Sequence, residues 1–439
     1  MKRYSSYKDS GVDWIREIPT HWGKNRIKHI VDYVNGYSFK SDDFDKEKEI
    51  PVIRIGDVGN EIDFKKCVKV DREFLESKSD FVVRKNDILI GLTGGTIGKS
   101  GRYRYETPSL LNQRVGLLRN TNKVLNGLLF YYVQSEIFMR YILFDCYGGG
   151  QDNIGMGDIL QMVFPLPPIS EQKQIVEYLD SKTEKIDNLI KYKEDKIELL
   201  KEQRIGLINH VVTKGLNDNV EYSSSDERWF ERYPKHWDCV HFGVICNLQQ
   251  GLQIPFDDRF FEKVENSYEY ITTQSIHKPD QPRQYVQNPK ESVICYEDDI
   301  IYGRTGNTGE VVTNVHGVFH NNFFRIDFNR EVLNKDFLVW YLSNNRFREH
   351  ILLLSGTTTI PDLNHGSFYS TRCLIPPLNE QEQIVNHLNE RTKEIDDLIL
   401  MEQKKIELLK EYRQSIISEV VTGKIRVCQE DNSTLVETI

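Results

Sequence analysis

The chain has 439 residues, 39% of them hydrophobic and 28% charged, with a formal net charge of −9. This length predicts two or more domains, and the negative charge excludes a surface that is basic throughout while leaving local basic patches open. No apolar run approaches the roughly 18 residues of a membrane-spanning helix, and the first residues lack the apolar core of a secretory signal.

The first 164 residues have the pattern of a mixed α/β domain. The segments "IPVIRIGDV" from Ile50 and "DFVVRKNDILIG" from Asp80 predict strands, and "LLFYYVQSEIFMRYIL" from Leu128 predicts a helix. Between them, "GLTGGTIGKS" at residues 91–100 is similar to the end of a phosphate-binding loop. The strict pattern requires a glycine where Thr93 stands, and the segment that follows is a poor helix. We therefore expect a glycine turn between two strands.

A long helix follows the first domain. Two prolines precede it, Ser170 is a natural N-cap, and Gly215 is a natural stop. Its apolar residues recur at spacings of three, four and seven, which is typical of a coiled coil: Ile175, Leu179, Ile186, Ile190, Ile197, Leu200, Leu207 and Val211. A helix of about 45 residues spans roughly 65 Å at ~1.5 Å per residue.

The chain then repeats itself. The 47 residues from Pro167 match those from Pro376 at 25 positions without a gap. "WIREIPTHW" from Trp14 recurs as "WFERYPKHW" from Trp229, and these tryptophans are predicted core anchors. The turn also recurs, but Glu310 replaces Lys99, and a phosphate-binding loop depends on its lysine. The chain is thus two copies of one unit. A nucleotide site in the turn is disfavoured both by Thr93 at the required glycine position and by Glu310 at the lysine position of the second copy.

This repeat predicts the domain organisation. Bodies at 1–164 and 216–374 alternate with long helices at 165–215 and 375–426, and a tail follows at 427–439. The second helix is expected to start with Asn379 as its N-cap and to stop at Gly423. The two helices most simply bury their stripes against each other and space the bodies. Further apolar residues beside the first stripe widen it beyond a two-helix seam and favour additional partner helices over a pair that only spaces the bodies: Val176, Leu189, Leu199 and Ile208.

The two bodies differ in charge and in their polar segments. Residues 1–164 hold 25 Lys and Arg against 22 Asp and Glu, a net +3, whereas residues 215–375 hold 15 against 22, a net −7. In "SGRYRYE", Arg102 and Arg104 are suited to phosphate contacts, or the segment is an ordinary exposed hairpin. Amides at Asn112 and Gln113, and at Asn321 and Asn322 in the second copy, are suited to adenine edges or to turns.

Two bodies that each end in "PP-[IL]-x-EQ" and a near-identical long helix resemble the specificity subunit of type I restriction–modification systems. The motif is carried by Pro167, Pro168, Glu171, Gln172 and Ile175, and again by Pro376, Pro377, Glu380, Gln381 and Ile384. The strand turns at 87–98 and 299–309 and the segment "QDNIGMGDILQMVFPLPP" are also similar to that family. One departure is that "TTTIPDLNH" in the second copy lacks the Gln-x-Asn present at Gln151 and Asn153.

The resemblance implies an α+β fold with two α/β target recognition domains separated by two long antiparallel coiled-coil helices. It implies a non-catalytic subunit whose domains each read one half of a bipartite, asymmetric site in double-stranded DNA. The helices would set the spacer and dock two adenine methyltransferase (modification) subunits, and a restriction subunit would hydrolyse ATP. S-adenosylmethionine would bind the partners, and we expect no cofactor, metal or catalytic residue in this chain.

The turns and the segments after them complete the set of candidate DNA contacts, which then comprises Lys99, Arg102, Arg104, Asn112, Gln113, Gln151, Asn153, Arg304, Thr305, Asn307, Asn321 and Asn322. The alternative function is a duplicated coiled-coil adaptor that binds proteins, and sequence-specific, salt-dependent DNA binding separates the two. Seven widely separated cysteines without CxxC spacing predict reduced, packed thiols and a cytoplasmic protein.

Overall fold

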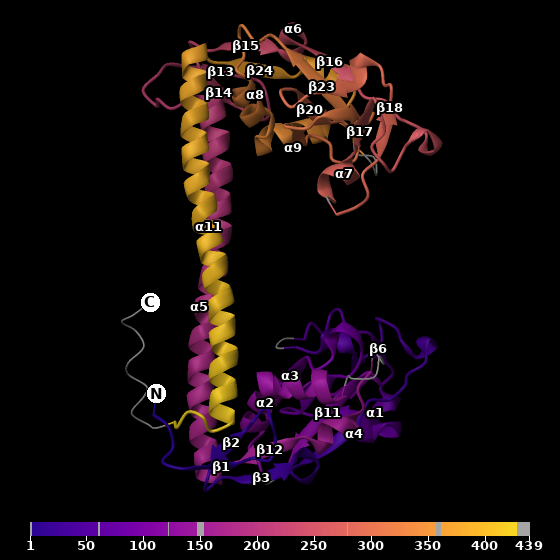
Figure 1. Cartoon of the computed structure of the whole chain (residues 1–439), viewed down its shortest axis with the longest axis vertical. Helices are drawn as coiled ribbons and strands as arrows, with labels where there is room; N and C mark the ends of the chain where they lie inside the picture. Colours follow the sequence, from indigo (N-terminus) through magenta and orange to yellow (C-terminus); the bar gives the residue numbers. More distant parts are fainter. Residues whose placement is uncertain are drawn as a thin grey trace. The chain divides into compact units, whose positions relative to one another are not determined.

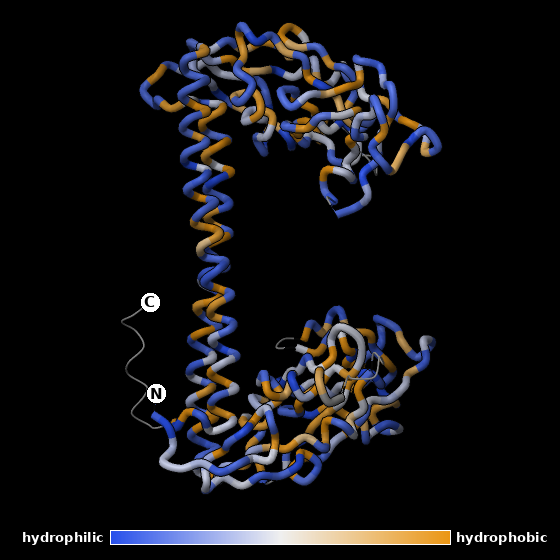
Figure 2. The backbone as a smooth tube through the Cα atoms, in the orientation of Figure 1, coloured by the Kyte–Doolittle hydropathy of each residue, from blue (hydrophilic) through white to orange (hydrophobic). Residues whose placement is uncertain are grey.

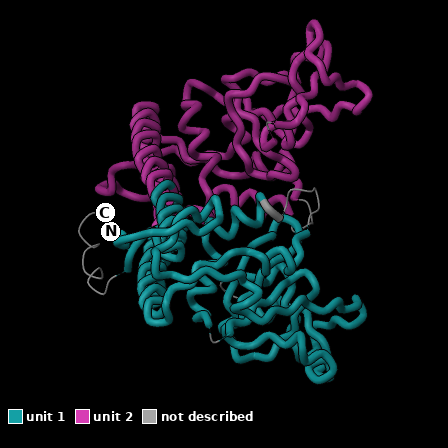
Figure 3. Tube along the Cα trace, turned by 60° about the horizontal axis from the view of Figure 1, so that its bottom comes forward, with its two compact units in different colours: residues 1–194, 404–439 teal, residues 195–403 magenta. Residues whose placement is uncertain are grey.

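The computed structural model describes residues 2–59, 62–121, 123–146, 153–278, 280–356 and 361–427. The chain divides into two compact units, unit 1 (residues 1–194 and 404–439) and unit 2 (residues 195–403), which Figure 3 shows in two colours. Across the described ranges, every helix is too short or too polar to cross a bilayer.

The described part of unit 1 contains twelve short strands and four short α-helices besides its long-helix segments. The strands are β1 (Tyr7–Asp9), β2 (Glu17–Pro19), β3 (Gly23–Arg26), β4 (Val31–Asn35), β5 (Ile50–Ile53), β6 (Lys69–Val70), β7 (Val82–Val83), β8 (Ile88–Gly91), β9 (Ser100–Arg102), β10 (Ser109–Leu111), β11 (Val115–Asn120) and β12 (Val163–Leu166). The helices are α1 (Glu73–Ser77), α2 (Asn126–Gln134), α3 (Glu136–Tyr141) and α4 (Met156–Gln161).

Unit 2 repeats this series of strands and most of the helices. Its strands are β13 (Tyr222–Ser224), β14 (Arg232–Pro234), β15 (Asp238–His241), β16 (Cys246–Gln250), β17 (Ser267–Ile271), β18 (Tyr285–Gln287), β19 (Ile294–Cys295), β20 (Ile300–Gly303), β21 (Val311–Val312), β22 (Gly317–Phe319), β23 (Phe323–Phe328) and β24 (Arg372–Ile375). Its short helices are α6 (Phe242–Ile245), α7 (Thr273–His277), α8 (Lys335–Leu342), α9 (Asn345–Leu354) and α10 (His365–Ser370).

The sheet topologies of the two units correspond strand by strand. Unit 1 has sheets in the orders β4-β11-β8-β9 and β6-β5-β10-β7, and unit 2 has β16-β23-β20-β21 and β18-β17-β22-β19. One parallel pair occurs at the same place in each, β5 with β10 and β17 with β22. The two-stranded ribbons β3-β12 and β15-β24 correspond as well. Over the described residues, the repeat seen in the helices therefore extends to the sheets of both bodies.

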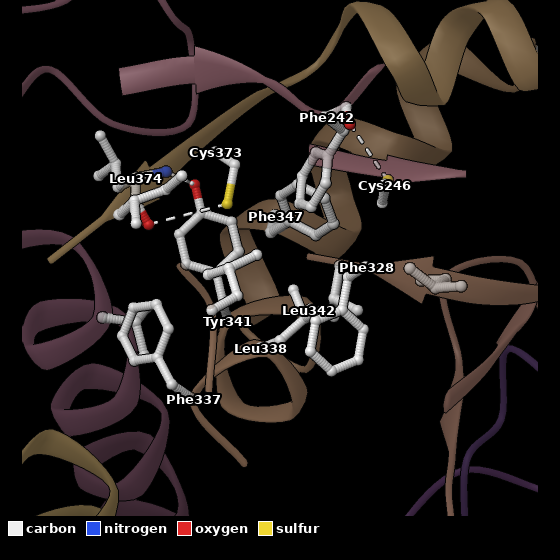
Figure 4. Packing of buried hydrophobic residues seen from close by; sticks show 14 of the residues in the cluster. Phe242, Cys246, Phe328, Phe337, Leu338, Tyr341, Leu342, Phe347, Cys373 and Leu374 are labelled. Carbon is white, nitrogen blue, oxygen red and sulfur yellow. Dashed lines mark hydrogen bonds between the residues drawn. The ribbon is translucent and has the colours of Figure 1, made fainter. Parts of the chain in front are cut away.

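Large apolar side chains fill the core of unit 2 (Figure 4). Phe242 and Tyr341 pack against the ring of Phe347, with centroids 5.8 and 5.6 Å away. The hydroxyl of Tyr341 accepts a hydrogen bond from the amide of Leu374 at 3.0 Å, so this buried phenol is not left unpaired. Trp22, Trp229 and Trp237 are buried as predicted, and Trp14 is half-buried. The cysteines whose side chains the structure describes are free thiols.

Several predicted elements are interrupted. The run from Asp80 forms two strands, β7 and β8, because Asn86 turns the chain with a φ of 75°. The single helix expected from Leu128 is two helices, since Ser135 ends α2 and its hydroxyl accepts a hydrogen bond from Phe138 N as the cap of α3. Asn344 caps α9 in the same way and separates it from α8. These local caps outweigh the apolar periodicity that predicted single elements.

The two long helices are α5 (Ile169–Lys214, 46 residues) and α11 (Leu378–Val421, 44 residues). Each begins one residue before its predicted cap, so Ser170 and Asn379 lie in the first turn. Gly215 directly follows α5 with a φ of 75°, a conformation that glycine adopts at helix ends. Figure 2 shows apolar positions recurring along both helices among hydrophilic ones.

Within each unit, part of α5 runs antiparallel to part of α11 (Figure 1). In unit 1 Arg413 Nε donates to Asp187 Oδ1 at 2.8 Å. In unit 2 Arg204 Nε lies 3.0 Å from Asp396 Oδ1. In unit 2 the stripe residues Val211, Ile384 and Leu388 belong to the core cluster of the body, so the stripes pack against the body as well as facing the partner helix. The buried members of the stripes are Ile175, Leu179, Ile186, Ile190, Ile197 and Val211 of α5 and Ile384, Leu388, Ile395, Ile406, Ile416 and Val420 of α11.

The glutamine of each Glu-Gln pair anchors the start of a long helix to its body. Gln172 is 1% exposed, and its side-chain oxygen accepts from Leu125 N at 2.8 Å while its amide nitrogen donates to Pro167 O at 2.9 Å and Lys123 O at 3.3 Å. Gln381 makes the equivalent three bonds in unit 2, to Asn334 N, Pro376 O and Val332 O. One buried amide thus satisfies three backbone groups that would otherwise lack partners.

The preceding glutamate joins the same helix start to the N-terminal hairpin of its unit. In unit 1 the indole nitrogen of Trp22 donates to Glu171 Oε2 at 3.0 Å, and His21 Nε2 lies 2.9 Å from the same oxygen. In unit 2 His236 Nε2 lies 2.9 Å from Glu380 Oε2. The histidine of each repeated sequence, "PTHW" and "PKHW", therefore contacts the glutamate of the repeated "EQ".

We expect the substitution Gln172→Ala to lower the free energy of unfolding by about 2–4 kcal/mol, because it leaves several buried backbone groups unpaired. Urea unfolding followed by circular dichroism measures this. The control is Gln174→Ala, two residues further along the same helix and exposed, which should change stability by less than about 0.5 kcal/mol. Equal effects of the two substitutions would contradict the anchoring role.

Candidate nucleic-acid interface

A glycine turn connects β8 to β9 in unit 1. Gly91 N donates to Lys99 O at 2.8 Å, and Gly98 N donates to Gly91 O at 3.0 Å. Gly98 has a φ of 75°, and a Cβ there would lie 2.6 Å from Met139 Sδ, so both backbone and packing require glycine. The strand β9 follows directly, whereas a phosphate-binding loop leads into a helix.

The turn of unit 2 has the same backbone bonds and different side chains. Gly303 N donates to Glu310 O at 2.7 Å, and Gly309 N donates to Gly303 O at 2.8 Å. Glu310 occupies the position of Lys99, and its carboxylate lies 2.9 Å from His277 Nε2. Lys99 itself is exposed. The shared turn therefore presents a cation in one unit and a paired carboxylate in the other.

A second segment lies against each turn. Ile154 N donates to Leu92 O at 2.8 Å in unit 1, which places Asn153 opposite Thr93. Leu363 N donates to Arg304 O at 3.1 Å in unit 2, which places Asp362 opposite Thr305. Asp362 is thus the counterpart of Asn153, and this accounts for the missing Gln-x-Asn in the second copy. Gln151 lies outside the described residues.

The loop that enters β11 or β23 forms the third segment. Leu92 N donates to Arg114 O at 3.1 Å, and Arg304 N donates to Asn322 O at 2.7 Å. Arg114 is therefore the counterpart of Asn322, which pairs Gln113 with Asn321 and Asn112 with His320. Of the four predicted amides, only Gln113 and Asn321 are therefore equivalent to each other.

In unit 1 these three segments surround an open hollow of about 600 Å³. Its lining includes Asn35, Thr93, Gln113, Arg114 and Asn153. Gln113 and Arg114 are both exposed. Glutamine and asparagine amides pair with adenine edges, and arginine pairs with guanine or phosphate. The hollow brings together the predicted Gln113 and Asn153, and it adds Arg114, which the sequence analysis missed although it adjoins Gln113.

The basic segment after the turn is divided by strand alternation. Arg102 is half-buried, with its guanidinium 4.6 Å from the centre of the Phe130 ring of α2, and burial lowers its pKa. Tyr103 is fully buried, whereas Arg104 is exposed. The position of Arg102 favours packing against α2 over a contact with a DNA phosphate. Arg104 is exposed and can make such a contact.

In unit 2 the predicted residues bind one another. Arg304 donates to Asp362 Oδ2 at 2.9 Å and to Leu363 O at 3.2 Å, and its side chain is 21% exposed. Thr305 Oγ1 donates to Asp362 Oδ1 at 2.8 Å. Asn307 Nδ2 donates to Glu310 Oε2 at 3.2 Å. Arg304 stands where unit 1 has Leu92, and its guanidinium links the three segments.

The family model described as "Type I restriction modification DNA specificity domain" matches residues 19–199 and 234–410, one match in each copy of the repeat. The chain is 26% identical to the putative type I restriction enzyme MjaX specificity subunit of Methanocaldococcus jannaschii, over 94% of this chain and 96% of that one. It is 22% identical to the type I restriction enzyme EcoBI specificity subunit of Escherichia coli, over 95% and 89%.

Solved structures of the same kind share the fold. A chain from a study of complex assembly and conformational transition of the type I R-M system aligns with a TM-score of 0.69 and 16% identity, covering 93% of this chain and 99% of that one. The HsdS subunit of Thermoanaerobacter tengcongensis aligns with a TM-score of 0.51 and 15% identity, covering 93% and 98%. With the family matched in both copies, this chain belongs to the type I restriction–modification DNA specificity family and is a non-catalytic, DNA-recognising subunit.

Proposed function

We propose that each unit reads one half of a bipartite, asymmetric DNA site. The observation that carries the proposal is the contrast at two equivalent positions on one repeated scaffold. Unit 1 has Arg114 and Asn153, where unit 2 has Asn322 and Asp362, while Gln113 and Asn321 provide an amide in both. Different donors and acceptors at equivalent positions select different base edges.

The proposed roles of the candidate residues follow from their surroundings. Lys99 and Arg104 are exposed cations and are suited to phosphates, which hold the register of a DNA complex. Asn112 and Gln151 stay predicted contacts. Arg304, Thr305 and Asn307 are better suited as positioning residues, since their polar atoms bind neighbouring residues of unit 2. The ion pair with Arg304 also offsets the charge of Asp362, which would otherwise repel phosphates.

The modular reading predicts a one-sided change of specificity. Replacing residues 216–374 with the corresponding segment of another specificity subunit should change only one half of the recognised motif, because the replaced segment lies within unit 2. Methylation mapping of the host genome gives the motif before and after the exchange. A change in both halves would contradict independent reading by the two units.

We also propose that the long helices dock modification subunits, one on each unit. Equivalent positions of the two helices carry large apolar side chains that stay exposed: Leu189, Tyr192 and Leu199 on α5, and Leu398, Met401 and Leu408 on α11. In each helix these positions are three and seven residues apart and so share one face. Of the four apolar residues that lie beside the first stripe in the sequence, only Leu189 and Leu199 belong to this exposed face. Ile208 is buried, and Val176 lies against Gly127.

Each unit carries three of these six side chains, which supports two equivalent docking surfaces for two partner copies. The partners would supply S-adenosylmethionine-dependent methylation of adenine. A restriction subunit that hydrolyses ATP would complete the enzyme. An exposed apolar face on a charged helix is typical of a protein–protein contact.

Removing the apolar face of unit 2 should release one partner. Leu199 and Leu398 lie between the ion pairs Lys196–Glu402 and Arg204–Asp396, at the same level of the helix pair. Leu199→Asp combined with Leu398→Asp should reduce the bound modification subunits from two to one in light scattering after gel filtration. Leu353→Asp is the control, since Leu353 on α9 is as exposed as Leu199, at 65%. Retention of both partners by the double variant would exclude this face.

The helices are further proposed to set the spacer between the half-sites. Seven residues inserted between Glu194 and Asp195 and between Gln403 and Lys404 keep the apolar stripe in phase. They add about 10 Å of helix, which corresponds to roughly three base pairs at ~3.4 Å each. We expect the preferred spacer to lengthen accordingly, measured by binding to duplexes with a series of spacers.

Insertion of five residues at the same places is the matched control, because it rotates the stripe off its partner and should disrupt folding. Weaker binding by the seven-residue variant is expected, since the added DNA turns by nearly a third of a revolution. If the seven-residue variant keeps full activity and the original spacer preference, the helices do not set the distance between the half-sites.

A further inference from the structure

Unit 2 contains an open cleft of about 510 Å³ beside the loop of Asn321 and Asn322, distinct from the hollow described in unit 1. Its lining includes Phe256, Arg259, Phe261, Lys278, Arg283 and Asn322, together with further hydroxyl and amide groups. Three of the described lining residues are cations and none is a carboxylate, while Glu269 pairs with Arg283 from outside the lining. This is a local exception in a body whose residues 215–375 carry a net charge of −7. A surface of this sign attracts polyanions.

The two guanidinium groups of the cleft are held in fixed positions. Arg259 Nε donates to Ile254 O at 3.0 Å, and the guanidinium lies 5.0 Å from the centre of the Tyr270 ring. Arg283 Nη1 donates to Ser275 O at 2.7 Å and to Glu269 Oε1 at 2.8 Å. Lys278 follows α7 at the rim and is exposed, so its ammonium can reach a ligand without breaking a packed core. The cleft thus combines two arginines held in fixed positions, one of them paired with Glu269, with one exposed lysine.

Two phenyl rings stand exposed at the same cleft. Phe256 is 61% and Phe261 is 53% exposed, and their ring centroids are 5.8 Å apart. Exposed rings beside cations are the combination with which proteins hold nucleic acid, since a ring packs on a base or sugar while a cation meets the phosphate. Asp257 and Asp258 lie next to Phe256 and are exposed, but neither lines the cleft.

We propose that this cleft clamps the DNA backbone beside the second half-site, with Lys278 and the two arginines at phosphates and the two phenyl rings against a sugar or base. His320 and Asn322 form part of its wall, so the bound backbone would adjoin the loop proposed to read bases. The inference rests on the proposed function. It explains how an acidic body holds an acidic ligand, through a patch whose residues are scattered between positions 256 and 322.

The test compares Lys278→Ala and Phe261→Ala with two matched controls in the full chain, assembled with its modification subunits. Lys290→Ala removes another exposed lysine of unit 2, and Phe260→Ala removes the neighbouring ring, 40% exposed and outside the cleft lining. The probe is a fluorescein-labelled duplex that carries the motif found by methylation mapping, titrated from low to moderate salt, with a scrambled duplex for comparison.

We expect Lys278→Ala to reduce the slope of log affinity against log salt by about 0.9, the effect of one lost phosphate contact. Phe261→Ala should weaken binding at least about fivefold through lost stacking, while both controls stay within about twofold of the unsubstituted complex. Lys278→Arg keeps the charge and should restore the slope, which separates loss of the contact from misfolding.

Affinity and salt slope unchanged in Lys278→Ala and Phe261→Ala, in a complex that still prefers its motif, would overturn the cleft and leave the proposed function standing. The cleft would also be overturned if Lys290→Ala weakened DNA binding as much as Lys278→Ala, or if Phe260→Ala weakened it as much as Phe261→Ala. If the unsubstituted complex does not distinguish the motif from the scrambled duplex, the proposed function fails and the clamp fails with it.

Discussion

The rest of the structure depends on burying one apolar stripe along each of two helices of 46 and 44 residues. Each buried Ile or Leu contributes about 1.5–3 kcal/mol relative to exposure, so neither stripe can remain in water. Antiparallel pairing meets this constraint within the chain and leaves each unit with the start of one helix and the end of the other. The starts carry the Glu-Gln pairs, and buried Gln172 and Gln381 join each helix to its own body through three backbone bonds. The similarity of the repeated segments therefore has a physical cause in the buried stripes and the anchoring glutamines.

The repeated scaffold separates residues that hold the fold from residues that vary. Glycine turns, strand order and helix anchors recur in both units, whereas several side chains at the three converging segments differ, among them Leu92 and Arg304, Arg114 and Asn322, and Asn153 and Asp362. In unit 1 these side chains line an open hollow, and in unit 2 Arg304 closes a network with Asp362 and Leu363. A chain built this way can change what it recognises without changing how it folds, because the varying side chains lie at turns and strand ends.

Much of the fold is predictable because it is periodic or repeated. The 3- and 4-residue spacing revealed both long helices, and the duplication revealed the two bodies. The interruptions at Asn86, Ser135 and Asn344 were not predicted, because the spacing of apolar residues does not reveal where a single capping or turn residue ends an element. The candidate site was predicted only in part. The match of Asp362 with Asn153, the inward packing of Arg102 and the cleft of unit 2 all depend on contacts between residues far apart in the chain.

The central claim, recognition of a bipartite DNA site by two differing units, is tested most directly by mapping methylated adenine in the genome of a host with and without this gene. The account predicts a methylated motif of two unlike specific parts separated by a nonspecific spacer, present only when the gene is present. A methylation pattern that is the same without the gene, or a gene-dependent motif that is continuous or symmetric, would contradict it.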